Sequence, residues 1–246
     1  MKVYETGNIR NIVVMGHGGC GKTTLVEAIA YQTGITARMG KVTDGNTISD
    51  YDKEEQKRQF SISTSVVPVE FEDIKINFLD TPGYFDFVGE VEEACHAAGA
   101  AVIVINGKSG VEVGTLKAWE LCEKYKLPRL FFVTGMDDDQ ASYRKIVLEL
   151  NDRFGRKVAP FHVPIRENEK FVGFVNVVKM KGRRFINDTS EYEECDIPDY
   201  MDKHLNISRD ALVEAVADTS EELMERYFAG EEFTYEEVST ALRTHV

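Results

Sequence analysis

The chain of 246 residues carries 42 acidic and 29 basic side chains, a formal charge of -13, and 43% of its residues are hydrophobic. This composition is typical of a globular protein, and a chain of this length needs no disulfide or metal to stabilise its fold. The acidic balance argues against bulk attraction to nucleic acid, because such affinity comes largely from Lys and Arg neutralising phosphates. We therefore expect no direct sequence-specific binding of nucleic acid by this chain.

The four cysteines, at positions 20, 95, 122 and 195, are far apart and form no C-x-x-C pair. Neither a zinc site nor a disulfide scaffold is indicated, and a reducing cytoplasm is the simplest environment. The first residues contain no apolar signal core, and no apolar run approaches the length that crosses a bilayer. We expect a cytoplasmic monomer that does not associate with membranes.

Short apolar runs alternate with helical stretches through the first part of the chain. The pattern predicts strands at 9–15, 100–105 and 130–133, a strand pair within 62–80, and helices at 22–32, 87–98, 114–126 and 140–153. Strands that alternate with helices of this length favour an α/β fold, with a doubly wound, mostly parallel sheet covered on both faces.

After Gly155 both the spacing and the charge change. Strand-like runs at 158–164, 171–179 and 183–186 precede acidic helices near 208–228 and 234–243. Residues 1–185 hold 25 acids and 25 bases, whereas residues 186–246 hold 17 acids and 4 bases. We expect a core domain over 1–156 and an appended or inserted acidic α+β subdomain over 157–246.

The motif GHGGCGKT at 16–23 fits G-x-x-x-x-G-K-[ST] between an apolar strand and a helix. Glycines allow backbone N–H groups to point at phosphates, and the helix N-terminus favours anions. Lys22 would reach the β- and γ-phosphates, and the Thr23 hydroxyl would bind Mg²⁺. His17 and Cys20 are interpreted as loop residues whose backbone matters. The residues predicted to bind nucleotide here are Gly16, His17, Gly18, Gly19, Cys20, Gly21, Lys22, Thr23 and Thr24.

A second part of the same site is predicted where the strand near residue 80 ends. The sequence Asp80-Thr81-Pro82-Gly83 places a carboxylate at the edge of the sheet where open α/β sheets bind ligands. Asp80 can hold Mg²⁺ through water, and the backbone N–H of Gly83 can sense a γ-phosphate. The ordinary alternative is a polar strand end followed by a Pro-Gly turn.

With these motifs the sequence resembles the translational GTPases, and elongation factor G in particular. The resemblance rests on GHGGCGKTT at 16–24, DYDKEEQKRQFSIS at 50–63, DTPGYFDFVGEVE at 80–92, GVEVGTLKAW at 110–119, TGMD at 134–137 and VADTSEELMERYFAGEEFTYEEVSTALR at 216–243. It implies a P-loop GTPase fold, GTP or GDP with Mg²⁺ as ligands, and a GTP-driven switch that acts on the ribosome. It also implies that Ser61 takes the place of the family's Mg²⁺-binding Thr, so the expected metal ligands are Thr23, Ser61 and Asp80.

Two departures from the family pattern bear on activity. The family's water-orienting His is Tyr84 here, a larger ring and a poor copy of an imidazole, so we expect slow hydrolysis with Tyr84 and Lys22 as the catalytic residues. The guanine-reading motif Asn-Lys-Met-Asp appears as Thr134-Gly135-Met136-Asp137. Asp137 can still accept from the guanine base, although it can equally cap a helix, and base specificity should weaken.

Two further departures concern the phosphate loop and the end of the sequence. Gly19 occupies a position where the family commonly has Asp beside a monovalent cation. In the family a strand carrying Ser-Ala, a base-contacting loop and a closing helix follow the inserted subdomain, and the sequence ends at Val246 before them. We expect the last strand and helix of the domain to be absent, and nucleotide binding to be weaker than in an intact factor.

The acidic part of the chain has two interpretations. Glu221, Glu222 and Glu225 crowd one predicted helix, which is either an ordinary solvated face or a docking site. In elongation factor G the matching helix meets a basic domain of the ribosomal stalk protein, and charge complementarity of this kind speeds encounter. The resemblance therefore implies the ribosome, with its stalk protein, as a partner.

Three functions remain open from the sequence. The first is a GTPase that acts on the ribosome, and the second is a non-hydrolysing, nucleotide-gated ribosome-binding or regulatory paralogue. The altered base motif also leaves a P-loop ATPase or kinase open, although the resemblance through the later segments disfavours it.

Overall fold

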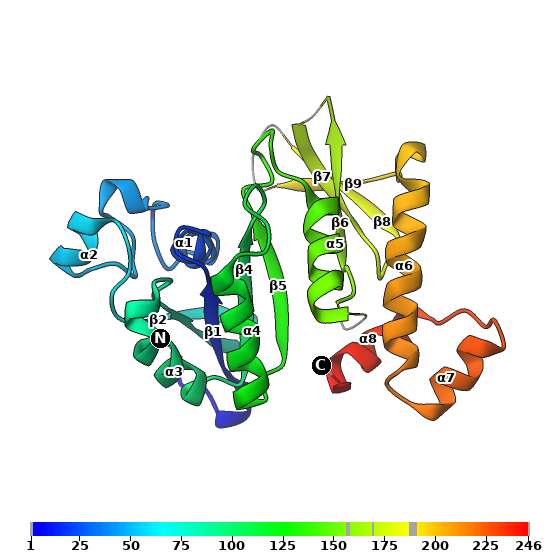
Figure 1. The fold of residues 1–246 in the computed structure, drawn as a ribbon, viewed down its shortest axis with the longest axis horizontal. Helices are drawn as coiled ribbons and strands as arrows, with labels where there is room; N and C mark the ends of the chain where they lie inside the picture. Colours follow the sequence, from blue (N-terminus) through cyan, green and yellow to red (C-terminus); the bar gives the residue numbers. More distant parts are fainter. Residues whose placement is uncertain (1, 156–157, 169, 187–190, 246) are drawn as a thin grey trace. The chain divides into compact units, whose positions relative to one another are not determined.

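A computed structural model of the chain describes residues 2–155, 158–168, 170–186 and 191–245. The chain forms two compact units, Met1–Gly135 and Met136–Val246 (Figure 1). Over the described residues, every helix is too short or too polar to traverse a lipid bilayer.

The first unit is built on a five-stranded sheet with the strand order β2-β3-β1-β4-β5. Its strands are β1 (Ile9–Gly16), β2 (Ser65–Phe71), β3 (Ile74–Asp80), β4 (Ala100–Asn106) and β5 (Arg129–Thr134). All neighbours are parallel except β2 and β3, which are antiparallel. The predicted mostly parallel α/β sheet is therefore confirmed.

Helices cover both faces of this sheet, as the continuous apolar runs of the central strands require. The helix α1 (Lys22–Gln32) packs on one face, where Val14, Val26 and Val104 are buried. The helices α3 (Val88–Ala97) and α4 (Val113–Tyr125) pack on the other, against Met15 and Ile103. The two apolar clusters fix the ends of β1 and β3 next to the start of α1.

A short helix, α2 (Lys53–Arg58), lies in the polar stretch for which the sequence predicted no helix. The Asp52 side chain accepts from the backbone N–H of Glu54, and Asp52 and Glu55 form a capping box. The helix ends at Gln59, which has a φ of 59°. Isolated helices this short are unstable, so α2 depends on these caps and on its packing. Single 3₁₀ turns occur at Thr6–Asn8, Val42–Asp44 and Phe85–Phe87.

The second unit combines an antiparallel sheet with helices. The sheet order β6-β7-β8-β9 follows the chain, with β6 (His162–Glu167), β7 (Lys170–Asn176), β8 (Lys181–Phe185) and β9 (Tyr192–Cys195). Its helices are α5 (Tyr143–Phe154), α6 (Asp202–Ala217), α7 (Glu221–Phe228) and α8 (Tyr235–His245), with a 3₁₀ turn at Asp199–Met201. Val163, Val175, Leu212 and Val238 are among the residues of its apolar core.

The structure differs from the sequence-based predictions at three features of this unit. The single helix expected over 208–228 is wrong, because the chain forms α6 and α7 with a break at which the Ser220 hydroxyl caps α7 by accepting from Leu223 N at 3.2 Å. Strand β9 was missed because its residues are largely polar and exposed. The strand expected over 158–164 begins only at His162. Residue 157, where the inserted subdomain was expected to begin, lies outside the described residues.

The compact units also divide earlier than the boundary expected at residue 156. The helix α5 was assigned to the first part of the chain, but Tyr143 packs against the apolar core of the second unit. Contacts therefore place the division at Gly135, where β5 ends. The assignment of 1–156 to a nucleotide-binding core and 157–246 to an inserted subdomain stays a prediction.

Candidate nucleotide-binding site

The loop between β1 and α1 has the backbone shape of a phosphate cradle. Gly16 and Gly21 have φ angles of 148° and 95°, where L side chains are strained. A Cβ at Gly16 would also collide with the carbonyl oxygen of Val104 on β4. The glycines allow the loop to turn sharply into the N-terminus of α1, where backbone N–H groups and the helix dipole favour an anion.

The Lys22 side chain folds back over this loop. Its Nζ donates to the backbone carbonyls of Gly16 at 3.2 Å and His17 at 2.9 Å, and the residue is 6% exposed. A Cβ at Gly83 would collide with Lys22 Nζ and lie 2.8 Å from the Cα of Gly18. The structure therefore brings the glycine of the Asp80-Thr81-Pro82-Gly83 segment against the phosphate loop, as expected for two parts of one site.

His17 and Cys20 are tied into the fold around the loop. The backbone N–H of Gly114 donates to His17 Nδ1 at 3.3 Å, and His17 Nε2 lies 3.6 Å from Glu112 at the start of α4. Cys20 is 1% exposed, and burial raises the pKa of its thiol. A buried thiol with a raised pKa is poorly nucleophilic, so both residues have a structural explanation.

Hydroxyl and carboxylate groups converge beside Lys22. Thr23 Oγ1 lies 3.2 Å from Ser61 Oγ, and the Ser61 hydroxyl donates to Asp50 Oδ1 at 2.8 Å. The Ser49 hydroxyl donates to Asp80 Oδ2 at 2.7 Å. The Thr23 hydroxyl also hydrogen-bonds Asp80. The structure thus brings together the three expected metal ligands. It adds Ser49, which no motif marks, and Asp50, which lies in the segment 50–63 but to which the sequence analysis assigned no role.

This cluster has the donor chemistry of a magnesium site. Asp50 Oδ2 and Asp80 Oδ1 are buried without a hydrogen-bond partner. Buried carboxylate oxygens are costly unless they are paired or bind a cation, and Mg²⁺ prefers oxygen ligands. Among the described residues no group of three or more His, Cys, Asp or Glu forms a metal cage. In nucleotide sites, Mg²⁺ is bound by one or two carboxylates together with the phosphates of the nucleotide. The carboxylates and hydroxyls of this cluster are therefore suitable ligands for Mg²⁺.

The electrostatics of Asp80 and Asp50 follow from their burial. Burial raises the pKa of Asp80 to about 6. Hydrogen bonds from the Ser49 and Thr23 hydroxyls and the positive charge of Lys22 act in the opposite direction and lower this pKa. Burial also raises the pKa of Asp50, opposed by the hydrogen bond from Ser61. A divalent cation would favour the ionised form of both carboxylates.

The side chain of Thr81 has a structural role. It is fully buried, and its hydroxyl donates to the carbonyl of Val14 on β1 at 2.7 Å. This bond holds the end of β3 beside the phosphate loop. A contact of this segment with phosphate would therefore come from its backbone.

The polar stretch 41–61 is held by two buried carboxylates, which the sequence analysis also missed. Glu27 of α1 accepts from the backbone N–H groups of Gly40 at 2.8 Å and Ile48 at 2.7 Å. Glu55 accepts from Ile62 at 2.9 Å and from Ser63 at 3.1 Å. A segment with few apolar residues is thus fixed largely through hydrogen bonds from its backbone to these two carboxyl groups.

The expected base-reading segment begins at the end of β5. The Thr134 hydroxyl donates to the carbonyl of Cys20 at 2.7 Å, which ties β5 to the phosphate loop, and Gly135 follows with a φ of 62°. Met136 is buried and Asp137 is exposed, and both belong to the second unit.

Arg166 of β6 clamps the segment that carries Asp137. Its guanidinium donates to the carbonyls of Ala141 at 2.6 Å, Asp138 at 3.0 Å and Met136 at 3.3 Å. No motif in the sequence marks this arginine, because its partners are backbone atoms about 25 to 30 residues earlier in the chain.

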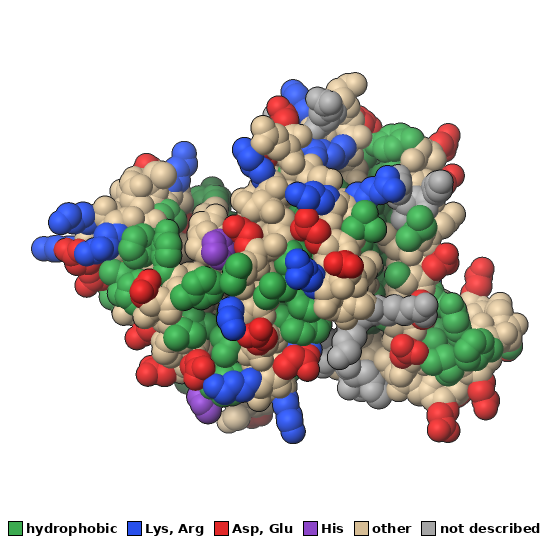
Figure 2. Space-filling model, viewed as in Figure 1, with side chains coloured by type: hydrophobic (Ala, Val, Ile, Leu, Met, Phe, Trp, Pro, Cys, Tyr) green, Lys and Arg blue, Asp and Glu red, His purple; other side chains and the backbone are tan. Residues whose placement is uncertain are grey.

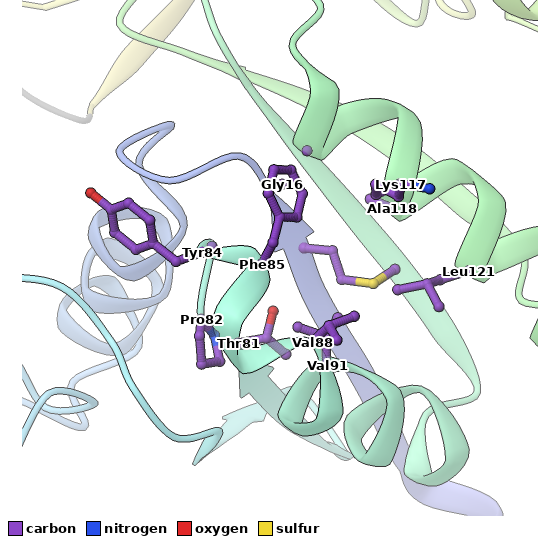
Figure 3. A pocket seen from close by; sticks show the side chains of 13 residues that line it. Gly16, Thr81, Pro82, Tyr84, Phe85, Val88, Val91, Lys117, Ala118 and Leu121 are labelled. Atoms are coloured by element: carbon purple, nitrogen blue, oxygen red, sulfur yellow. The ribbon is translucent and has the colours of Figure 1, made fainter.

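A small open pocket lies beside the phosphate loop (Figure 3). Its volume is about 40 Å³, and Val88, Val91, Ala118 and Leu121 form much of its apolar side, while the ring of Tyr84 extends away from them. Sites for small molecules commonly measure several hundred Å³. The pocket is therefore too small for a nucleotide, and the phosphate loop remains the candidate site.

Two comparisons with known proteins agree with this geometry. A family model, the elongation factor Tu GTP binding domain, matches residues 7–240. The crystal structure of ttk003000868 from Thermus thermophilus is similar, with 37% identity, a TM-score of 0.87 and 95% of this chain covered. The chain spans 35% of the length of that protein. The chain belongs to the family of the elongation factor Tu GTP binding domain, and it is the GTP-binding domain of a translational GTPase of the elongation factor G and elongation factor Tu type.

Proposed function

We propose that the protein containing this chain is a GTP-driven switch that acts on the ribosome in the cytoplasm and hydrolyses GTP slowly. The observation that carries the proposal is the cluster of Thr23, Ser61 and Asp80 beside Lys22, completed by two buried carboxylate oxygens without partners. A P-loop fold without such a cluster would support phosphate binding alone.

In the proposed reaction a water oxygen bonds to the γ-phosphorus of GTP. The bond from that phosphorus to the oxygen bridging to the β-phosphate breaks, and the water protons remain with phosphate and solvent, giving GDP and phosphate. Lys22 would neutralise charge on the β- and γ-phosphates, and the backbone N–H of Gly83 would bind the γ-phosphate. Thr23, Ser61 and Asp80, supported by Asp50, would hold Mg²⁺, which supplies further neutralisation of phosphate charge.

Tyr84 is the reason to expect slow hydrolysis. It follows Gly83 and is 47% exposed, and it stands where the family resemblance places His. Positioning of the attacking water accounts for much of phosphoryl-transfer catalysis, so a phenol in place of an imidazole would cost rate.

The test is GTP hydrolysis by the intact protein with and without ribosomes, in the native form and as Tyr84→His. We expect slow native turnover that ribosomes stimulate and that the substitution accelerates. Fast native turnover that Tyr84→His slows would contradict the role given to Tyr84. Absence of turnover together with retained GTP binding would favour the second candidate, a non-hydrolysing, nucleotide-gated ribosome-binding or regulatory protein.

Base specificity is part of the same test. Thr134 and Gly135 replace the residues that read guanine in the family, and Asp137 is the remaining candidate for the base. We propose preference for GTP over ATP through Asp137, weaker than in the family. Equal competition by ATP would favour the ATPase or kinase alternative.

The proposed docking site is α7 with its acidic side chains. Glu221, Glu222 and Glu225 are exposed on α7, and Figure 2 shows acidic side chains around a hydrophobic area at the α7 end of the chain. Phe228, at the end of α7, is 80% exposed. We propose that a basic domain of the ribosomal stalk protein docks there, which would speed encounter through charge.

A further inference from the structure

The ends of β4 and β5 lie side by side next to the phosphate loop. The sheet order places β1 between β3, which ends at Asp80, and the parallel pair β4 and β5 (Figure 1). Open α/β sheets bind ligands at the carboxyl ends of their strands. A nucleotide with its phosphates at the loop after β1 and its metal beside Asp80 would therefore extend its base over the ends of β4 and β5.

Asn106 is the last residue of β4, and hydrogen bonds hold its side chain in one orientation. Its register partner is Thr134 at the end of β5, and the Gly107 N–H donates to the Thr134 carbonyl at 2.8 Å. Asn106 Oδ1 accepts from the backbone N–H groups of Lys108 at 3.0 Å and Ser109 at 3.2 Å. Two N–H donors on one atom identify it as the amide oxygen, which leaves Nδ2 on the other branch of the amide.

The Nδ2 group lies against Gly135 and is open to a ligand. A Cβ built on Gly135 would lie 3.5 Å from Asn106 Nδ2, and the glycine has no side chain to cover this group. Asn106 is half-buried, and its Nδ2 is not one of the buried side-chain atoms that lack a partner. Among the residues that the structure describes, none accepts a hydrogen bond from it. Two N–H donors at the end of β4 are therefore available.

The purine bases differ at the atom that such a donor would meet. Guanine has the acceptors O6 and N7, whereas adenine has an amino group at C6 in place of O6. The Asn106 amide can donate through Nδ2, but both lone pairs of its oxygen are used by backbone N–H groups. A side chain that donates and does not accept favours guanine over adenine.

We infer that Asn106 is a specificity-determining residue that donates from Nδ2 to O6 of the guanine base. The inference rests on the proposed function and deepens it, because it adds a contact to the one proposed for Asp137. Asp137 would accept from the N1 and N2 donors of guanine, so the two side chains read different atoms. Asn106 thus supplies an amide donor that Thr134 and Gly135 lack.

The test compares the native protein with Asn106→Asp in the intact protein, by equilibrium titration with GTP, ITP and ATP. ITP keeps O6 and lacks only the N2 amino group. The carboxylate keeps an acceptor for the N–H groups of Lys108 and Ser109 but cannot donate to O6. We expect GTP and ITP to bind roughly tenfold more weakly and ATP to bind as well or better, because its amino group can donate to the carboxylate. Equal weakening of all three nucleotides would overturn the inference.

Asn8→Asp is the matched control, since Asn8 is exposed in the same unit and undergoes the same chemical change. It should leave the three affinities at their native values, and a loss equal to that of Asn106→Asp would overturn the inference. A measurement on the native protein needs no substitution. The native protein should bind ITP more tightly than ATP, and equal affinities would exclude a contact with O6.

The Asp137→Ala background separates the contact with O6 from recognition of N1. We expect a preference for ITP over ATP to persist in Asp137→Ala, and to vanish or reverse when Asn106→Asp is added. Loss of the preference in Asp137→Ala alone would overturn the role of Asn106.

Turnover separates this inference from the proposed function. If the intact protein binds GTP but does not hydrolyse it with ribosomes, the proposed reaction fails. Discrimination that Asn106→Asp removes would then retain the base contact in a non-hydrolysing protein. Ribosome-stimulated turnover together with discrimination that Asn106→Asp leaves unchanged would keep the proposed function and reject the contact.

Discussion

The hydroxyl of Thr134 donates a 2.7 Å hydrogen bond to the backbone carbonyl of Cys20, and so joins the end of β5 to the phosphate-binding loop. These residues are 114 positions apart in the chain. A Cβ at Gly21 would lie 3.3 Å from Thr134, so the side chain also packs against the loop. The residue that departs from the family's base motif thus supports the shape of the phosphate site.

We expect Thr134→Val to weaken GDP binding, because it leaves the Cys20 carbonyl without this donor while preserving the volume of the side chain. A lost hydrogen bond of this kind costs about 1 kcal/mol, or roughly fivefold in affinity. Titration with a fluorescent GDP analogue measures the effect. Thr134→Ser retains the hydroxyl and should bind nearly as the native protein does, so equal weakening by both substitutions would refute the role of the bond.

Ser61→Ala should reduce the dependence of GTP binding on Mg²⁺. The Ser61 hydroxyl bonds Asp50 and lies beside Thr23, so its loss removes a proposed ligand and leaves Asp50 with neither oxygen bonded. We expect the gain in GTP affinity on adding Mg²⁺ to fall about tenfold. Affinities measured in Mg²⁺ and in EDTA give this gain directly. The exposed neighbour Ser63 offers the control Ser63→Ala, and an equal loss there would argue against a metal role for Ser61.

Arg166→Met should loosen the segment that carries Asp137. Three backbone carbonyls would lose a charged donor, at a cost of about 1 to 3 kcal/mol in the stability of the second unit. If Asp137 reads the base, discrimination between GTP and ATP should also fall. Thermal unfolding measures the loss of stability, and competition binding measures the discrimination between GTP and ATP. Arg144→Met, at an exposed position on α5, is the control. If Arg166→Met leaves the discrimination between GTP and ATP unchanged, the hydrogen bonds of Arg166 do not contribute to recognition of the base.

The stability of the second unit should fall as acid protonates Glu237. Hydrogen bonds from Arg226 and then from the backbone of Thr234 lower the pKa of Glu237 to about 2 from its usual 4.5. A carboxyl whose folded-state pKa is lowered contributes stability above pH 4.5, and this contribution is lost as the pH falls towards 2. Unfolding midpoints between pH 5 and 2 should therefore drop less steeply in Glu237→Gln. The exposed Glu236 gives the control Glu236→Gln, and identical pH profiles for native and Glu237→Gln proteins would exclude this contribution.

Reversal of Glu221, Glu222 and Glu225 to Lys should slow association with the ribosomal stalk domain and remove its dependence on salt. Stopped-flow association at several ionic strengths measures this. The control reverses Glu193, Asp196 and Asp199, which are exposed in the same unit and give the same change in charge. The docking proposal would be abandoned if the α7 variant associated as fast as the native chain. Circular dichroism should accompany the test, since Lys near the start of α7 opposes the helix dipole.

Local patterns were enough to predict much of this protein. The phosphate loop lies between a strand and a helix because its glycines and its flanking apolar runs dictate that geometry over a few residues. The alternating runs likewise predicted all five strands of the first sheet within a few residues. The acidic helix was predicted too long, because the Asp-Thr-Ser break before α7 was read as helical.

Which side chains share the site depends on the three-dimensional arrangement of the chain. Ser49 meets Asp80, Thr134 meets Cys20, and Gly18 meets Tyr84 across chain separations that no short motif spans. Such contacts depend on how the sheet and its loops are placed in space, and the residues involved carry no local signature. Contiguous motifs were sufficient to identify the phosphate loop and the family resemblance. The groups that support the loop are seen only in the fold, because they are distant in the chain and are brought within hydrogen-bond and van der Waals distance by its folding.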